Sequence, residues 1–138
     1  MAAYALLAGS LAVGLRRRRR DVRRLTALDL LLLGLATEHI SRLITKDAVT
    51  APLRAPFTEF EGPAGEGEVN EEAVGRGVRR AVGELVTCPF CVAQWVATGL
   101  IAGELIAPEL TTAAVSVCAA ARASDYLQLV YGILRQKQ

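Results

Sequence analysis

The chain has 138 residues, enough for one domain, and 52% of them are apolar although 22% are charged. Seven of the sixteen basic residues fall within residues 16–24, so the net charge of +2 is local and does not indicate a nucleic-acid-binding surface. Aromatic residues make up 5% of the chain, which is too few for base-stacking platforms. Three cysteines are too few for a disulfide framework. This composition favours a membrane protein.

Residues 1–24 form the first predicted unit, an N-terminal apolar helix followed by an arginine run. The apolar stretch ends at Leu15, and the arginines come after it, which is the reverse of a secretory signal, so we expect no cleavage. Fifteen helical residues reach only about 22 Å, which is short for a membrane span. We therefore expect a weaker membrane helix whose arginines lie beside anionic headgroups.

The second predicted unit is a membrane domain, residues 25–134, that opens with a helix over 26–46. Thr26 and Asp29 match a capping box in front of a leucine-rich run. Glu38 and Arg42 are four residues apart with the acid first, which is the favoured order for a pair on one helix face. His39 follows Glu38.

An acidic loop is predicted at about 48–74. Pro52 and Pro56 disfavour a regular helix there, and a glycine-rich segment follows at 62–67. From Arg76 to Val86, apolar residues recur at helical spacing, which predicts a short helix in the membrane interface.

Two further spans are predicted, at 89–107 and 110–134. The first covers roughly 28 Å, close to the thickness of a bilayer core. Gly99 and Gly103 predict close packing against the second, which is rich in small residues. The expected fold is all-α: a small polytopic membrane bundle with three core transmembrane helices and the weaker N-terminal helix.

Ionisable and polar residues of these three helices are predicted to lie at one depth. Because consecutive spans alternate in direction, these residues fall roughly 7–10 Å from the same face. Ionisable groups inside a membrane usually pair in the bundle interior, so the layer is either a structural network or a working site. The predicted polar intramembrane cluster contains Glu38, His39, Arg42, Gln94, Arg122 and Asp125.

A cysteine turn precedes the 89–107 helix. Cys88 is placed at the N-cap, Pro89 at the first helical position and Cys91 in the first turn. The positive end of the helix favours a thiolate there, so Cys88 and Cys91 are the candidate catalytic residues. A structural role, in which the two cysteines tighten the helix start, is favoured over this chemistry, and metal binding is the third alternative. A four-ligand site needs more partners and His39 is the only histidine, so no metal site is assigned and no cofactor is expected.

Several separate motifs, in this order, resemble a bacterial family of small membrane proteins known as domain of unknown function 1360. The resemblance covers about residues 26–132. It implies an integral membrane protein with a CPxC-type turn, and it supplies no activity and no catalytic residues. The motifs are Arg42–Asp47, Pro52–Phe57, Gly75–Gly77 and Gly83–Cys91, followed by Trp95.

We therefore expect a multi-pass integral protein of the cell membrane. A structural or interaction role is favoured over that of an enzyme, with the lipid bilayer and another membrane protein or a second copy as partners, and no nucleic acid. The alternative is a membrane thiol–disulfide oxidoreductase, with Cys88 as the attacking thiolate and Cys91 as the resolving thiol, or a metal-binding protein using the same pair.

Overall fold

The computed structural model describes residues 25–136 together with Tyr4, Leu6, residues 9–10 and Val13. The predicted N-terminal helix and arginine run, residues 1–24, lie almost entirely outside the described residues. In chain order the elements are α2 (Ala27–Thr45), η1 (Ala48–Thr50), α3 (Ala51–Arg54), β1 (Thr58–Gly65), β2 (Glu68–Ala73), α4 (Val78–Thr87), α5 (Pro89–Ile106) and α6 (Pro108–Gln136).

Helix α2 begins where the capping residues predict. The Thr26 N–H donates to Asp29 Oδ2 at 2.8 Å, and the Asp29 N–H donates to Thr26 Oγ1 at 3.2 Å. These two bonds satisfy amide groups that have no partner inside the helix. The predicted capping box is confirmed.

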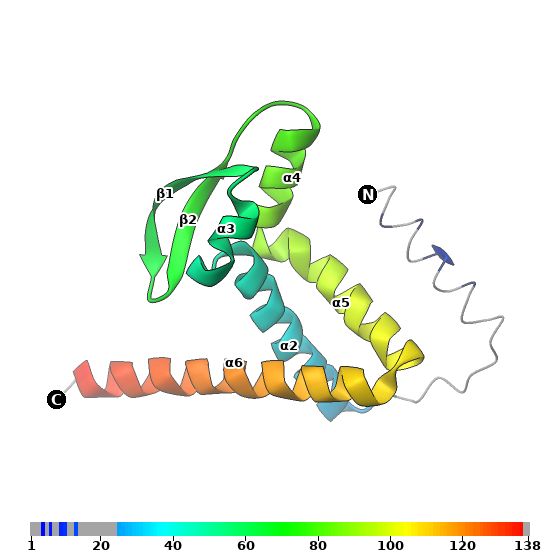
Figure 1. The fold of residues 1–138 in the computed structure, drawn as a ribbon. Coiled ribbons are helices and arrows are strands. Elements are labelled where there is room, and N and C mark those ends of the chain that lie inside the picture. Colours follow the sequence, from blue (N-terminus) through cyan, green and yellow to red (C-terminus); the bar gives the residue numbers. More distant parts are fainter. Residues whose placement is uncertain (1–3, 5, 7–8, 11–12, 14–24, 137–138) are drawn as a thin grey trace.

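The long helices meet through small side chains and a thin apolar core. Leu33, Ala36 and Val115 are buried where α2 crosses α6. Gly103 of α5 lies so close to α6 that an added Cβ would stand 2.6 Å from Thr111 Oγ1. The predicted close packing at Gly103 is confirmed, whereas a Cβ at Gly99 would meet nothing within 4 Å. Figure 1 shows α2 and α5 meeting near the strands, with α6 extending beyond both.

The predicted acidic loop is wrong, because residues 58–73 form an antiparallel β-hairpin. Its turn uses Gly67 at φ 76°, a left-handed conformation that favours glycine. Pro63 lies beside a register shift, where a strand can accommodate the missing N–H. The strands carry five glutamates and little apolar alternation, so periodicity does not reveal them.

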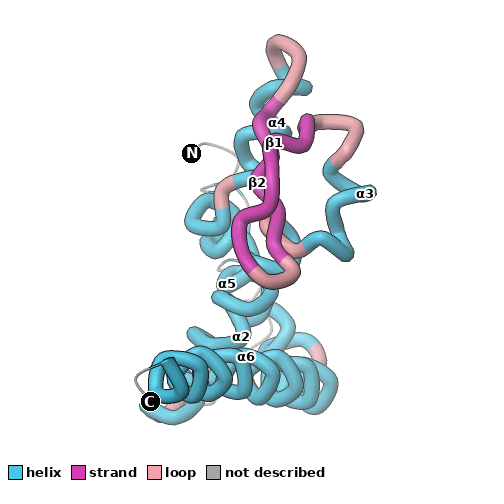
Figure 2. The backbone as a smooth tube through the Cα atoms, turned by 90° about the vertical axis from the view of Figure 1, so that its left-hand side faces the viewer, coloured by secondary structure: helices cyan, strands magenta, loops and turns pink. Residues whose placement is uncertain are grey.

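Main-chain bonds fix the hairpin to the C-terminal end of α2. The Val69 N–H donates to Lys46 O at 2.9 Å, and the Ala48 N–H donates to Gly67 O at 2.9 Å. Helix α4, which confirms the predicted short helix, covers β2 at Gly83, where an added Cβ would stand 2.8 Å from Ala73 Cβ. A two-stranded hairpin is marginal by itself, so these contacts supply its support. The strands, α3 and α4 gather at one end of the molecule (Figure 2).

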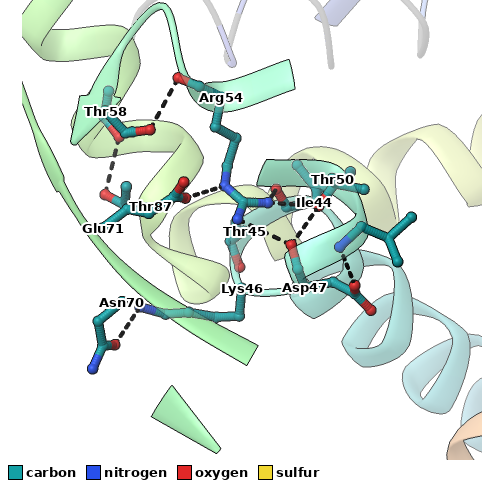
Figure 3. Close-up of polar contacts among 12 residues, drawn as sticks. Ile44, Thr45, Lys46, Asp47, Thr50, Arg54, Thr58, Asn70, Glu71 and Thr87 are labelled. Carbon is teal, nitrogen blue, oxygen red and sulfur yellow. Dashed lines mark hydrogen bonds and ion pairs between the residues drawn. The ribbon is translucent and has the colours of Figure 1, made fainter. Parts of the chain in front are cut away.

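Buried Arg54 connects the elements at this end of the molecule. We call the hairpin, α3 and α4 the polar end. The side chain of Arg54 is 3% exposed and forms an ion pair with Glu71 of β2, which is 6% exposed. Its guanidinium also donates to Ile44 O at 2.8 Å and to Asp47 O at 3.1 Å (Figure 3). Arg54 thus links α3 to the hairpin and to the end of α2.

The predicted three-span, all-α membrane bundle is wrong. The structure adds a two-stranded sheet, and within the described residues only Pro89–Ile106 is long and apolar enough to cross a membrane. Helix α2 carries Asp29, Glu38 and Arg42, while α6 carries Arg122 and Asp125 near its middle. These charges lower the apolar character of both helices, so the multi-pass localisation loses its basis.

Replacing Arg54 by Met should destabilise the protein by about 3–5 kcal/mol, because the Glu71 carboxylate remains buried without its partner. The double variant Arg54→Met, Glu71→Leu should recover part of this loss. Denaturant unfolding in detergent micelles measures both effects.

The matched control for this prediction is Arg80→Met. Arg80 and Glu84 are 51% and 60% exposed, so their pair should contribute no more than about 1 kcal/mol. Equal destabilisation by Arg54→Met and Arg80→Met would show that the buried pair does not hold the polar end together.

Candidate functional site

The cysteine turn forms as the sequence predicts. Cys88 is the N-cap of α5, Pro89 follows in the first turn, and the Cys91 N–H donates to Cys88 Sγ at 3.3 Å. Both cysteines are free thiols, with Cys88 partly buried and Cys91 exposed. At the start of α5, Cys88 Sγ therefore accepts a hydrogen bond, and the Cys91 side chain is accessible to solvent.

The surroundings of Cys88 favour its thiolate. A hydrogen bond from the Cys91 side chain is the main cause that lowers the pKa of the Cys88 thiol. Burial opposes this effect, whereas the N–H groups of Cys91 and Phe90 and the charge of Lys46 add to it. Lys46 ends α2, so two helices contribute to the charge balance at this sulfur. Low-pKa thiols of this kind are nucleophilic at neutral pH.

An ion-pair network joins α2 to α6. The Arg122 guanidinium forms an ion pair and a hydrogen bond with Glu38, and it donates to Asp125 Oδ2 at 3.3 Å. His39 Nδ1 lies 4.0 Å from Asp125 Oδ2. Arg122 also stacks over the Tyr126 ring, 4.8 Å from its centroid.

The Glu38–Arg42 pair is present but long, at 3.9 Å. Arg42 instead donates from Nε to Glu68 Oε1 at 2.8 Å and from Nη2 to Glu68 Oε2. This bidentate geometry is stronger than a single contact. Glu68 was not among the predicted site residues, because only the hairpin brings it back to α2. Two glycines close together, Gly65 and Gly67, were the available turn signal.

Of the six residues predicted to share one polar layer, five form this connected set, and Gln94 has other contacts. Gln94 Nε2 donates to the Tyr4 hydroxyl at 2.6 Å, and Thr98 donates to the same oxygen at 3.1 Å. Tyr4 also packs edge-on against Trp95. The network consists of Glu38, His39, Arg42, Arg122 and Asp125, joined by Glu68.

A cavity of about 480 Å³ lies between α2 and α5, next to the cysteine turn. Pro89 and Phe90 of the turn line it, and Glu38 and Arg42 line the opposite side. The cavity therefore adjoins both the turn and the ion-pair network. No group of three or more His, Cys, Asp or Glu side chains placed to hold a metal ion occurs within the part of the chain that the structure describes.

Two comparisons relate the chain to known proteins. A family model described as protein of unknown function (DUF1360) matches residues 32–131. The chain is also similar to sporulation protein YjcA of Bacillus subtilis (strain 168), with 35% identity over 88 residues, which covers 62% of this chain and 75% of the relative. No solved structure matches the chain. The family match covers α5, the cysteine turn, the hairpin and most of α2 and α6, so the chain belongs to the DUF1360 family of proteins of unknown function.

Proposed function

We propose that this chain is a membrane-anchored structural or interaction protein of the bacterial cell membrane, held in the bilayer by α5. The observation that carries this proposal is the exposure of α5. Only 11% of its 18-residue apolar stretch is buried inside the protein. The core helix of a soluble protein would bury its apolar surface, and large exposed apolar patches mark membrane or protein contacts.

The polar end of the molecule fits a position outside the bilayer. Six glutamates lie in the hairpin and its turn, and α4 exposes Arg79 and Arg80. Charged groups are costly within the hydrocarbon core, so the hairpin, α3 and α4 would face water while α5 enters lipid. This exposed end is the surface that we assign to a protein partner or a second copy. The relative's name directs the search for that partner to sporulating cells.

A lysine at Gly99 tests the membrane placement, because this exposed position lies near the middle of α5 and has open space around it. Gly99→Lys should reduce membrane insertion, since a central lysine costs about 2.5–3.5 kcal/mol. Flotation with phospholipid vesicles and carbonate extraction of cell membranes provide the measurement.

Gly99→Leu is the matched control and should remain fully membrane-bound. If α5 instead faced water, Gly99→Lys would be harmless or slightly stabilising, because glycine is a poor helix former. A wild-type protein released by carbonate, or a lysine variant that inserts normally, would contradict the proposal.

A second candidate function, thiol–disulfide exchange, is favoured by the contacts of Cys88. In this reaction the Cys88 thiolate attacks a disulfide of a partner protein, and one partner thiolate leaves. The Cys91 thiol then loses its proton to water, and the resulting thiolate attacks Cys88 Sγ and releases the second partner thiolate. The partner is reduced by two electrons and the pair is oxidised to a disulfide.

The rate of Cys88 alkylation should reach half its maximum at a pH below the pKa of an ordinary cysteine thiol, which is about 8.5. Cys91→Ala should raise this midpoint, because the Cys91 side chain is the main cause of the lowered pKa. Lys46→Met should raise it less, and Lys46→Arg should leave it unchanged. Mass spectrometry of iodoacetamide-treated Cys118→Ala protein gives the rate at each pH.

A Cys88 midpoint at or above the ordinary thiol value would remove the basis for thiol–disulfide exchange. The turn would then serve only to start α5.

A further inference from the structure

The cavity between α2 and α5 has graded polarity along its length. At one end it is lined by Leu30, Leu33 and Ile101, and at the other by Glu38, Arg42 and Phe90. The gradient comes from α2, because the α5 lining is apolar throughout and the polar side chains at this end, Glu38 and Arg42, both belong to α2. An occupant must therefore be apolar along most of its length and polar at one end.

The dimensions of the cavity restrict the occupant further. The lining residues span twelve residue-to-residue steps on each helix, from Leu30 to Arg42 and from Pro89 to Ile101. At 1.5 Å per residue this is about 18 Å, slightly more than one leaflet of a hydrocarbon core of about 30 Å. A mostly apolar space of this length, with polar side chains at one end, matches a single extended acyl chain that ends in a headgroup.

The charges at the polar end are already matched. Glu38 pairs with Arg122, and Arg42 pairs with Glu68. Neither side chain offers an uncompensated charge to an anionic or cationic group. A headgroup with no net charge fits this end better than a charged one.

We propose that this cavity holds one acyl chain of a zwitterionic membrane phospholipid, with the headgroup beside Glu38 and Arg42. The chain lies between α2 and α5 and runs from the cysteine turn toward Leu30 and Ile101. The inference rests on the proposed membrane position of α5, which brings the cavity into contact with lipid. The lipid would fill the space between two helices whose own side chains leave it open.

Gly34 gives a direct test, because it lines the cavity and an added Cβ there would meet nothing within 4 Å. Gly34→Leu should fill the space without a backbone clash. Gly99→Leu is the matched control, since it adds the same side chain to an open helix position outside the cavity lining. Ala97→Leu should fill the cavity from the α5 side, and it provides the same test if Gly34→Leu fails to fold.

The experiment uses the full chain in phosphatidylcholine vesicles that contain a small fraction of phosphatidylcholine with a photoreactive acyl chain. Flotation first measures membrane association. Irradiation and peptide mass spectrometry then locate the lipid adducts. We expect adducts at the cavity-lining residues, reduced about tenfold or more by Gly34→Leu and by Ala97→Leu, and unchanged in Gly99→Leu.

Adducts spread evenly over the exposed faces of α5 and α6, or unaffected by both filling variants, would overturn the lipid site while leaving the membrane anchor in place. Failure of the wild-type protein to float would overturn both the anchor and the lipid site.

Discussion

Two ion pairs on α2 hold the structure together in different directions. Glu38 binds Arg122 of α6, and one turn later Arg42 binds Glu68 of β2. The first pair connects α2 to a long helix, and the second connects it to the hairpin. Each charge is partly shielded from water, so the loss of one partner would leave an uncompensated charge at a helix junction.

This arrangement places every candidate functional feature at the boundary between the apolar helices and the polar end. The cysteine turn starts α5 there, and Lys46, at the end of α2, acts on Cys88 across the same boundary. The polar mouth of the cavity is lined by the two α2 residues that form the ion pairs. A protein anchored by α5 would present these groups at the membrane surface, where a water-soluble partner and a lipid headgroup both have access.

Local chemistry made the helices and the turn predictable from sequence. Thr26 and Asp29 set the start of α2, and Cys88 and Pro89 set the start of α5, because capping depends on neighbouring residues. The hairpin was not predictable from periodicity, since its strands are rich in glutamate and are supported by Arg54, which lies outside them. Glu68, the partner of Arg42, lies in the hairpin, so it was missed together with the hairpin. The number of membrane spans was overestimated because α2 and α6 were assigned as spans from their length, although both carry paired charged side chains.

The Glu38–Arg122 pair joins α6 to α2, and a double-mutant cycle measures the strength of this connection. The free energy of unfolding in detergent would be measured for wild type, Glu38→Gln, Arg122→Met and the double variant. We predict a coupling energy of about 1–3 kcal/mol, clearly larger than that of a parallel Glu38–Arg42 cycle, whose side chains are 3.9 Å apart. Additive effects, with a Glu38–Arg122 coupling below about 0.5 kcal/mol, would show that this pair does not hold α6 against α2.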